Sequence, residues 1–457
     1  MSFPRYPAYK DSGVEWLGEV PEHWSIEKFR YVCRESGEKI EDEVIGQMLS
    51  VSGYRGIEIK AYDDDNKRRT DEELQGYRIV RPGQLVVNTM WLNYAGLGVS
   101  AYLGHVSPAY RSYWVNAGVD LRFLHHLMRS STYVQGYSQL LTGIRPNSLQ
   151  MSRDDLMAFP ILLAPTDEQS RIARFLDHET AKIDALIQEQ QRLIELLKEK
   201  RQAVISHAVT KGLDPTVPMK DSGVEWLGEV PAHWEVRKLS TITDKITNGY
   251  VGPTRDLFVD AGIRYLQSLH IKNNEIRFTP EYFVPPDWSN AHSKSVLKEG
   301  DVLVVQTGDI GQSAVVTEEY AGCNCHALIV VSPVRQVLHG DYLAWVLNSG
   351  YGKNTLLSIQ TGALHPHLNC GYVKDVWIPL PPQSEQKEVV RYLKDELATF
   401  SNLTQQSTKI AAFLRARRSA LISAAVTGKI DVRNWKPPAD EHAFDEEVRQ
   451  AGLEAVS

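Results

Sequence analysis

The residues that could bind a metal lie in the second half of the chain. Cys323 and Cys325 flank one residue and precede His326, and further candidates follow in a later segment: His365, His367 and Cys370. Structural zinc sites usually present two Cys pairs with two to four intervening residues. The spacing here differs, and the first half has no equivalent residues. We therefore predict no metal site and interpret Cys323 and Cys325 as buried free thiols on a strand.

Recognisable catalytic motifs are absent from the sequence. The string GDIG at 308–311 follows the apolar run DVLVVQT, but it lacks the G-x-x-x-x-G-K-[ST] pattern that cradles nucleotide phosphates. No carboxylate–lysine pattern typical of nucleases stands out. We therefore expect no catalytic activity from this chain alone. The alternative is a stand-alone metal hydrolase that uses the Cys and His residues of the second half, and it predicts stoichiometric zinc in the purified protein.

The composition is that of a globular protein without a disulfide framework. The chain has 457 residues, of which 42% are hydrophobic and four are cysteines, so we expect a reducing, cytoplasmic environment. The N-terminal string MSFPRYPAYK lacks the apolar region of a signal peptide. The net charge is −7, and the acidic tail 431–457, with seven acids and three bases, carries −4 of it. The nearly neutral remainder can still form basic surfaces.

One 15-residue string occurs twice and divides the chain into halves. Residues 10–24 read KDSGVEWLGEVPEHW and residues 220–234 read KDSGVEWLGEVPAHW, so fourteen of fifteen positions match. Each copy carries two Trp residues, and we interpret the string mainly as a segment that anchors its own domain through these aromatic side chains. Such a repeat predicts two domains of similar structure.

A long helix is predicted at the end of each half. Residues 167–211 and 383–427 contain neither Pro nor Gly, and they are in register at an offset of 217 residues. Apolar side chains recur at heptad spacing in both: Ile183, Leu186, Leu193, Leu197 and Val204, then Leu393, Phe400, Leu403, Ile410, Leu414 and Leu421. Each stripe is too narrow for an isolated helix, so we expect the two helices to pack on each other. The connection 212–220 is short and the second helix begins at the far end of the second domain, so an antiparallel pair is the simplest arrangement.

These patterns predict an α+β fold with two mixed α/β domains separated by two long antiparallel coiled-coil helices, as a pseudo-twofold internal repeat. RPGQLVVNT (81–89) parallels KEGDVLVVQT (298–307), and TGIRPNSL (142–149) parallels TGALHPHL (361–368). Residues 119–141 predict one or two helices. The predicted parts are domain 1 (1–165), helix 1 (166–212), domain 2 (213–382), helix 2 (383–430) and the acidic tail (431–457).

Together these features resemble the specificity subunit of type I restriction–modification enzymes over residues 1–430. The resemblance rests on the SGVEWLGEVPxHW string, the L/P-rich strand before xxEQ and a long helix, the KRQAxIxxAVT helix end and the GDIG turn. It implies that each domain is a target-recognition domain that reads one half of a bipartite, asymmetric DNA site. It also implies that the helices set the spacing and dock adenine methyltransferase subunits, so that the chain directs both methylation and restriction.

The resemblance further implies the partners and cofactors. The partners would be double-stranded DNA, two methyltransferase subunits and, in the full complex, two restriction subunits, with no membrane. S-adenosylmethionine and ATP with Mg²⁺ would be bound by those subunits and no cofactor by this chain. An adenine methyltransferase would need an [ND]-P-P-[YF] motif, which VPPDW, LPPQS and KPPAD do not fit. The alternative, a coiled-coil adaptor unrelated to DNA, predicts no salt-dependent DNA affinity.

Polar and basic side chains on the domain loops are the candidates for DNA contact. Gln and Asn can pair with adenine through two hydrogen bonds, and Arg and Lys contact guanine or phosphate. In the first domain the candidates are Tyr54, Arg55, Lys67, Arg68, Arg69, Asn88, Arg111, Arg145 and Asn147. In the second they are Gln267, Ser268, His270, Lys272, Gln306, Thr307, Gln312, His365 and His367. Each is also open to interpretation as a solvated surface residue.

Basic residues occupy equivalent positions near the C-terminal ends of both predicted helices. Because the duplication gives both copies the same task, we predict that they dock a partner or contact DNA phosphates. The residues are Lys198, Lys200, Arg201, Arg415, Arg417 and Arg418. The alternative is a solvated face whose charge favours a helix C-terminus.

Overall fold

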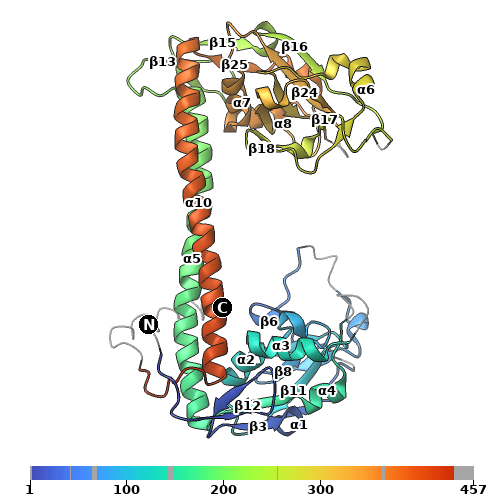
Figure 1. Cartoon of the computed structure of the whole chain (residues 1–457), viewed down its shortest axis with the longest axis vertical. Coiled ribbons are helices and arrows are strands. Elements are labelled where there is room, and N and C mark those ends of the chain that lie inside the picture. The colour runs from blue at the N-terminus through green and yellow to red at the C-terminus, as the bar shows by residue number, and fades with distance from the viewer. Residues whose placement is uncertain are drawn as a thin grey trace. The chain divides into compact units, whose positions relative to one another are not determined.

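The chain folds into two compact units that each mix helices and strands (Figure 1). The computed structural model describes residues 3–41, 43–63, 69–142, 149–254, 256–362 and 366–436. Unit 1 is Met1–Gln190 with Lys409–Ser457, and unit 2 is Gln191–Thr408. Within the described ranges, no helix is long and apolar enough to cross a membrane. The predicted α+β fold class is confirmed.

Two long helices, α5 (Thr166–Lys211) and α10 (Gln383–Val426), run antiparallel to each other (Figure 1). In unit 1, Ile183 of α5 clusters with Leu414 of α10. In unit 2, Leu197 and Ile205 of α5 share a core with Phe400 of α10. Residue numbers therefore increase along α5 in the direction in which they decrease along α10. The two helices thus pack antiparallel to each other, as predicted.

The predicted apolar stripe is only partly buried between the helices. Ile183, Leu197, Leu393, Phe400 and Leu414 are buried. Two packed helices bury one narrow seam, so apolar side chains beside that seam remain in solvent. Six such side chains are between 42% and 67% exposed: Leu186, Leu193 and Leu196 on α5, and Leu403, Ile410 and Phe413 on α10. Four of the predicted heptad positions are therefore exposed and not buried: Leu186, Leu193, Leu403 and Ile410.

Unit 1 contains two four-stranded sheets, ordered β6-β5-β10-β7 and β4-β11-β8-β9. Its main core joins the second of these sheets to α2 and α3, the two helices that form in the predicted helical stretch 119–141. The first sheet packs in a smaller cluster with Leu49, Ile57 and Val106. The strands are β1 (Tyr9–Asp11), β2 (Glu19–Pro21), β3 (Ser25–Lys28), β4 (Cys33–Glu35), β5 (Gln47–Ser52), β6 (Gly56–Ile59), β7 (Arg78–Val80), β8 (Leu85–Val87), β9 (Leu97–Val99), β10 (Gly104–Val106), β11 (Arg111–Val115) and β12 (Pro160–Leu163). The α-helices are α1 (Phe29–Val32), α2 (Leu121–Arg129), α3 (Ser131–Leu140) and α4 (Arg153–Ala158).

Unit 2 is built around a four-stranded sheet ordered β16-β24-β21-β22, next to a three-stranded sheet ordered β20-β17-β23. The strands are β13 (Met219–Asp221), β14 (Glu229–Pro231), β15 (Glu235–Lys238), β16 (Thr243–Asn248), β17 (Ile263–Leu266), β18 (Ile271–Lys272), β19 (Glu275–Ile276), β20 (Phe283–Val284), β21 (Val302–Val305), β22 (Ser313–Val315), β23 (Asn324–Cys325), β24 (Leu328–Pro333) and β25 (Trp377–Leu380). The α-helices are α6 (Pro286–Ala291), α7 (Gly340–Asn348), α8 (Gly350–Ser358) and α9 (Cys370–Val373).

The 15-residue repeat folds in both units as a short antiparallel hairpin, β1–β2 and β13–β14, and then reaches the start of a long helix. In unit 1, Trp24 Nε1 donates to Glu168 Oε1 at 3.1 Å, and His23 Nε2 lies 2.9 Å from Glu168 Oε2. In unit 2, Trp234 Nε1 donates to Glu385 Oε1 at 3.0 Å. The second Trp of each copy is thus an anchor of its own domain, as predicted.

The glutamine that follows each of these glutamates ties the helix to the domain a second time. Gln169 Oε1 accepts the N–H of Asp120, which caps α2, and its Nε2 donates to Ala164 O, both at 2.8 Å. Gln386 Oε1 accepts the N–H of His339, the residue before α7, at 2.8 Å. The xxEQ string is therefore the junction between domain and helix in both units.

The first Trp of the repeat adopts two different environments. Trp16 stacks on Phe159 with ring centroids 5.4 Å apart, over Gly136 of α3. When α3 and α8 are aligned on their N-cap residues, Ser130 and Ser349, Gly136 corresponds to Thr355.

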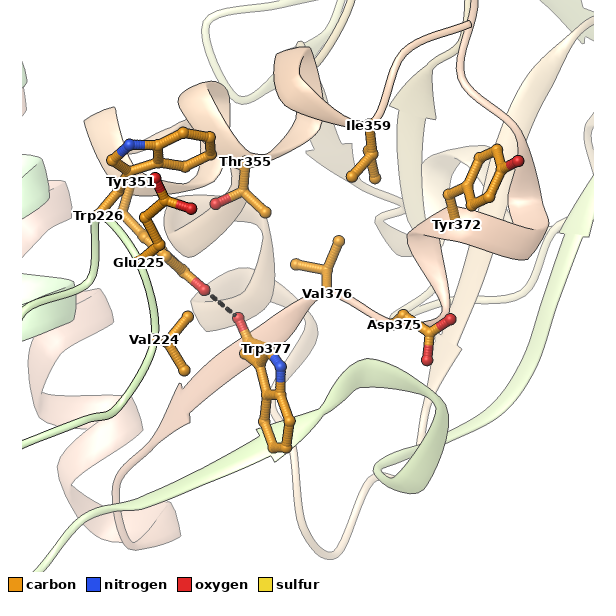
Figure 2. Close-up of a pocket in the computed structure, with 10 residues that line it drawn as sticks. All are labelled: Val224, Glu225, Trp226, Tyr351, Thr355, Ile359, Tyr372, Asp375, Val376 and Trp377. Carbon is orange, nitrogen blue, oxygen red and sulfur yellow. Dashed lines mark hydrogen bonds between the residues drawn. The ribbon is translucent and has the colours of Figure 1, made fainter.

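In unit 2, the position that corresponds to Gly136 carries the side chain of Thr355. Trp226 has φ +64° and is 52% exposed, and it lines a pocket of about 160 Å³ with Thr355, Val376 and Trp377 (Figure 2). Gly136 therefore leaves room for the Trp16 ring to pack against the core of unit 1, whereas Thr355 occupies the corresponding position in unit 2.

The first residues of the predicted acidic tail belong to the core of unit 1. Val432 is buried, and the Trp435 ring lies 5.4 Å from that of Phe175 on α5. Asp431 and Arg433 form an ion pair at 2.7 Å. Residues 437–457 lie outside the described residues.

Gly136→Ala is expected to lower the free energy of unfolding by about 1–3 kcal/mol, because the new Cβ would lie 2.5 Å from the Trp16 ring. This loss would occur although Ala is otherwise favoured over Gly inside a helix by about 1 kcal/mol. Urea unfolding followed by Trp fluorescence measures it. Gly37→Ala is the matched control, since its Cβ meets nothing within 4 Å. A Gly136→Ala protein as stable as the wild type would contradict this packing.

Candidate nucleic-acid interface

Three connections of unit 1 meet at one edge of its sheets. They are the turn between β5 and β6, the connection between β8 and β9, and the segment before α4. A Cβ on Gly53 would lie 2.5 Å from Tyr94 O, so the turn and the connection are in direct contact. Gln150 Nε2 donates to Thr89 Oγ1 at 3.4 Å, which joins the third segment to them. This edge brings predicted DNA-contact positions from distant parts of the sequence together.

Aromatic side chains are exposed along this edge of unit 1. Tyr54, Trp91 and Tyr94 are each half exposed, and the rings of Trp91 and Tyr94 lie 5.9 Å apart in an edge-to-face arrangement. Exposed rings on a nucleic-acid binder stack on bases or wedge between base steps. The sequence analysis missed Trp91 and Tyr94. The available signal was the aromatic string WLNY in a connection between two strands.

The β5–β6 turn rests on the helix pair through Tyr54. Its hydroxyl donates to Asp184 Oδ1 of α5 at 2.9 Å, and the guanidinium of Arg418 of α10 lies 5.2 Å from its ring. Arg418 Nε also lies 2.9 Å from Asp184 Oδ1. Burial and the hydrogen bond to Asp184 raise the pKa of Tyr54. The adjacent Arg55 is exposed and pairs with Glu58 at 3.1 Å.

Other predicted contacts of the first domain differ in accessibility. Asn88 is buried, and its Oδ1 accepts the N–H of Met90 at 3.2 Å, so it shapes the turn and its burial does not support base contact. Arg69 is exposed, with its guanidinium 5.5 Å from the Tyr77 ring. Four predicted residues lie outside the described ranges: Lys67, Arg68, Arg145 and Asn147.

Arg111 belongs to a group of three arginines around one carboxylate. Arg111 Nη1 lies 2.6 Å from Glu35 Oε1, Arg153 Nε lies 3.1 Å from Glu35 Oε2, and Arg78 Nη1 lies 3.8 Å from Oε1. One carboxylate neutralises one of three guanidiniums, so the group keeps positive charge. Arg111 pairs in register with Val87, the last residue of β8, so this charge lies beside the edge described above. Such a group suits phosphate contact.

In unit 2, the turn after β21 meets the β18–β19 hairpin and the loop before α9. Gln306 Nε2 donates to Leu368 O at 2.8 Å, and Thr307 forms an isolated β-bridge with His367. Gln312 Oε1 accepts the N–H of Asn273 at 3.0 Å. The structure therefore brings four predicted positions together: Gln306, Thr307, Gln312 and His367. Lys272 and Thr307 are exposed there, and His365 lies outside the described ranges.

His270 is fully buried, so its position does not support the predicted DNA contact. Its Nδ1 accepts the N–H of Gln267 at 2.8 Å, and its Nε2 lies 2.8 Å from Pro280 O. Burial lowers its pKa, so the ring is a neutral structural element. Gln267 caps the short helical turn at Ser268–His270, and both Gln267 and Ser268 are half-buried.

All four cysteines are free. Cys323 and Cys325 are buried as predicted, and burial raises the pKa of Cys325 to about 12. A thiol held in this protonated state is a poor metal ligand. Among the described residues, no group of three or more His, Cys, Asp or Glu side chains is arranged to hold a metal ion.

The six basic residues near the helix ends divide into two kinds. Lys198, Lys200, Arg415 and Arg417 are exposed. In unit 1, Arg418 pairs with Asp184 beside Tyr54. In unit 2, Arg201 is half-buried, and burial lowers its pKa, whereas the charge of the nearby Glu275 in the β18–β19 hairpin raises it. Arg201 and Arg418, at equivalent positions, therefore face their own domains.

Comparison with known proteins agrees with the resemblance seen in the sequence. Residues 231–412 match the family model described as the type I restriction modification DNA specificity domain. The type I restriction enzyme MjaVIII specificity subunit of Methanocaldococcus jannaschii is 25% identical over 60% of this chain and 63% of its own length. The EcoBI specificity subunit of Escherichia coli is 22% identical over 73% of this chain and 71% of its own length.

One solved structure shares the fold of nearly the whole chain. It belongs to work on complex assembly and conformational transition of the type I R-M system, with a TM-score of 0.70 and 17% identity over 90% of this chain and 99% of that one. At that identity the likeness concerns the fold.

Glu35→Gln is expected to lower the free energy of unfolding at pH 7 by about 1–2 kcal/mol, since three guanidiniums lose their carboxylate. Burial raises the pKa of Glu35, but the hydrogen bonds from Arg111 and Arg153 outweigh burial and hold it below its ordinary value of 4.5. The stabilisation is therefore complete above pH 4.5 and is lost as the pH falls through the folded-state pKa.

Urea unfolding at several pH values measures this dependence. The difference between wild type and Glu35→Gln should shrink below pH 4.5. Glu27→Gln is the control, because Glu27 is exposed on β3 and has no ion pair in the described structure. A difference that stays constant down to acid pH would contradict the proposed role of the charge.

Proposed function

The chain resembles type I restriction–modification specificity subunits and carries their DNA specificity domain in residues 231–412, and from this premise we propose that it is the DNA-reading subunit of such a complex. The family match of residues 231–412 carries this proposal. The edge of unit 2 that gathers Gln306, Thr307, Gln312 and His367 lies within the matched residues. Unit 2 would read one half of a bipartite DNA site and unit 1 the other.

The two half-sites should differ in sequence, because the two edges differ in chemistry. Unit 1 presents Trp91, Tyr94 and the arginine group around Glu35. Unit 2 presents Lys272 and Thr307 at the equivalent place, beside the Gly-rich turn at 308–311. Side chains of such different kinds read different base edges. The lengths of α5 and α10, 46 and 44 residues, would set the separation of the half-sites.

The exposed apolar side chains of the long helices support two equivalent docking sites for a partner. At the offset of 217 residues, the exposed apolar side chains of the two helices correspond to one another: Leu186 to Leu403, Leu193 to Ile410 and Leu196 to Phe413. Positions seven and ten residues apart lie on one side of a helix. Exposed apolar stripes mark protein–protein contacts. The repetition at identical positions favours two copies of one partner.

The rim of each stripe is basic. The exposed pair Lys198 and Lys200 corresponds to Arg415 and Arg417 at the same offset. A partner surface with an apolar centre and an acidic rim would therefore be complementary. We assign this surface to a methyltransferase subunit. That subunit would bind S-adenosylmethionine and transfer the methyl group to adenine, and a restriction subunit would use ATP and Mg²⁺ in the full complex.

The purified chain is expected to transfer no methyl group, and the chain mixed with its methyltransferase subunit is expected to methylate adenine at one bipartite sequence. Replacing residues 235–380 by the equivalent segment of another specificity subunit should change one half of that sequence and leave the other unchanged. Sequencing of methylated DNA measures both outcomes. An unchanged methylated sequence after the exchange would overturn the assignment of unit 2 to one half-site.

Substitution of one apolar stripe should remove one of the two docked subunits. Phe413→Glu and Leu196→Glu change equivalent, exposed side chains, so each variant should bind one methyltransferase subunit and the double variant none. Native mass spectrometry of the complex counts the subunits. Leu357→Glu, on an exposed position of α8, is the control and should still bind two. Binding of two subunits by the double variant would contradict docking on these stripes.

A further inference from the structure

The helix pair of each domain turns a corner at an equivalent residue. In unit 1, α2 ends at Arg129, and the next residue, Ser130, caps α3 through the N–H of Tyr133. In unit 2, α7 ends at Asn348, and Ser349 caps α8 through the N–H of Gly352. Arg129 and Asn348 therefore occupy the same place in the two domains, although their side chains differ.

Arg129 connects two of the loops at the candidate interface of unit 1. Its Nη1 donates to Ser52 O at 3.1 Å and its Nη2 to Gly53 O at 3.0 Å, in the β5–β6 turn. The same Nη1 lies 3.1 Å from Ala95 O and 2.5 Å from Leu97 O, where the connection after β8 enters β9. One guanidinium thus satisfies four backbone carbonyls of two loops that are more than forty residues apart in sequence.

The guanidinium of Arg129 is held by these carbonyl dipoles rather than by a carboxylate. Among the described residues it has no ion-pair partner. Burial and the charge of Arg418 lower its pKa only to about 10, so it stays charged at neutral pH. A buried charge is costly unless hydrogen bonds satisfy it, so displacing either loop would be unfavourable. A neighbouring contact adds to this constraint, since Val99 N–H of β9 donates to His125 Nδ1 of α2 at 3.2 Å.

Asn348 does the equivalent work in unit 2 with a neutral amide. Its Nδ2 donates to Asn274 Oδ1 in the β18–β19 turn at 3.0 Å and to Ser313 O, after the β21–β22 turn, at 2.8 Å. Its Oδ1 accepts the N–H of Ser313 at 3.1 Å. A fourth bond, from Nδ2 to Ala344 O at 2.9 Å, fixes the amide to its own helix. Both donors and the acceptor of the amide are therefore used.

We propose that Arg129 and Asn348 are positioning residues that lock the two DNA-reading loops of their own domain to each other. This inference rests on the proposed function for the identity of the ligand, but the locking itself is a property of the free chain. Base readout depends on placing several side chains at once, and a displacement of about 1 Å is enough to cost on the order of 100-fold in a positioned reaction. Each residue would therefore control the fidelity of one half-site and leave the other unaffected.

Hydrogen exchange on the free chain tests the locking without DNA. Arg129→Ala should speed amide exchange in the segments around 52–56 and 95–98 and leave unit 2 unchanged. Asn348→Ala should do so around 272–275 and 311–314 and leave unit 1 unchanged. The controls are Arg122→Ala on α2, whose arginine pairs with Asp177, and Asn354→Ala, an exposed position of α8. Wild-type exchange rates in both loops of both variants would overturn the inference, independently of any result with DNA.

Methylation by the assembled complex tests the consequence for specificity. Arg129→Ala should raise methylation of sites altered in one half-site by on the order of 10- to 100-fold relative to the intact site, and Asn348→Ala should do the same only for the other half-site. Arg129→Lys keeps the positive charge but replaces the two-armed guanidinium by a single ammonium, so its effect should lie between those of the wild type and Arg129→Ala. Asn348→Asp keeps the acceptor for Ser313 but loses both donors, so it should behave like Asn348→Ala.

The results distinguish this inference from the proposed function. A loss of thermal stability with equal effects on both half-sites would show a merely structural role and overturn the inference. A wild-type complex without sequence-specific methylation would overturn the proposed function, and hydrogen exchange would still decide whether the two residues lock their loops.

Discussion

A hydrogen-bonded carboxylate at the start of each long helix, buried in unit 1 and partly buried in unit 2, is the contact on which the arrangement of each unit depends. Glu168 is 6% exposed and receives hydrogen bonds from the Trp24 indole and the Tyr6 hydroxyl, with His23 beside it. Glu385 is bound in the same manner by Trp234 and His233. A carboxylate is buried at this cost only when its oxygens are satisfied. The adjacent Gln169 and Gln386 bind the loops before α2 and α7, so each helix start is fixed to two parts of its domain.

This junction explains why the two units share a scaffold but differ at their edges. The hairpin, the helix start and the helix corner are each fixed by side chains that recur in both halves. The loops beyond them are held by side chains that differ between the units, such as Arg129 in unit 1 and Asn348 in unit 2. Loop sequences can therefore change while the scaffold keeps its geometry. The function proposed above, reading of two different half-sites, would require this combination of constant support and variable contact.

The long helices carry a second division of tasks. Their buried seam joins α5 to α10. Arg201 and Arg418 lie toward their own units, and six apolar side chains are exposed to solvent. Neither the seam nor the domain contacts explain those six side chains. Their exact correspondence at an offset of 217 residues favours a use outside the chain, which is why docking of two equal partners is the function proposed for them.

Much of the architecture followed from local patterns in the sequence. The repeated string marked two domains, the absence of Pro and Gly with heptad spacing predicted both long helices, and their common register predicted equivalent structures. These features are legible because periodicity and backbone-breaking residues act over a few neighbouring positions. The candidate interface was predicted less well. Gln306, Thr307 and Gln312 lie at it, whereas His270 and Asn88 are buried and Trp91 and Tyr94 were missed.

The tertiary structure decided what depends on contacts between distant residues. Gly136 leaves room for Trp16 to pack against the core of unit 1, whereas Trp226 in unit 2 is exposed beside Thr355, although the repeated strings are nearly identical. Arg129 reaches carbonyls at positions 52, 53, 95 and 97, and no local pattern records that encounter. The repeat and the helices were thus determined by the sequence alone. The roles of single side chains were not, because burial and hydrogen-bond partners arise only when distant segments pack together.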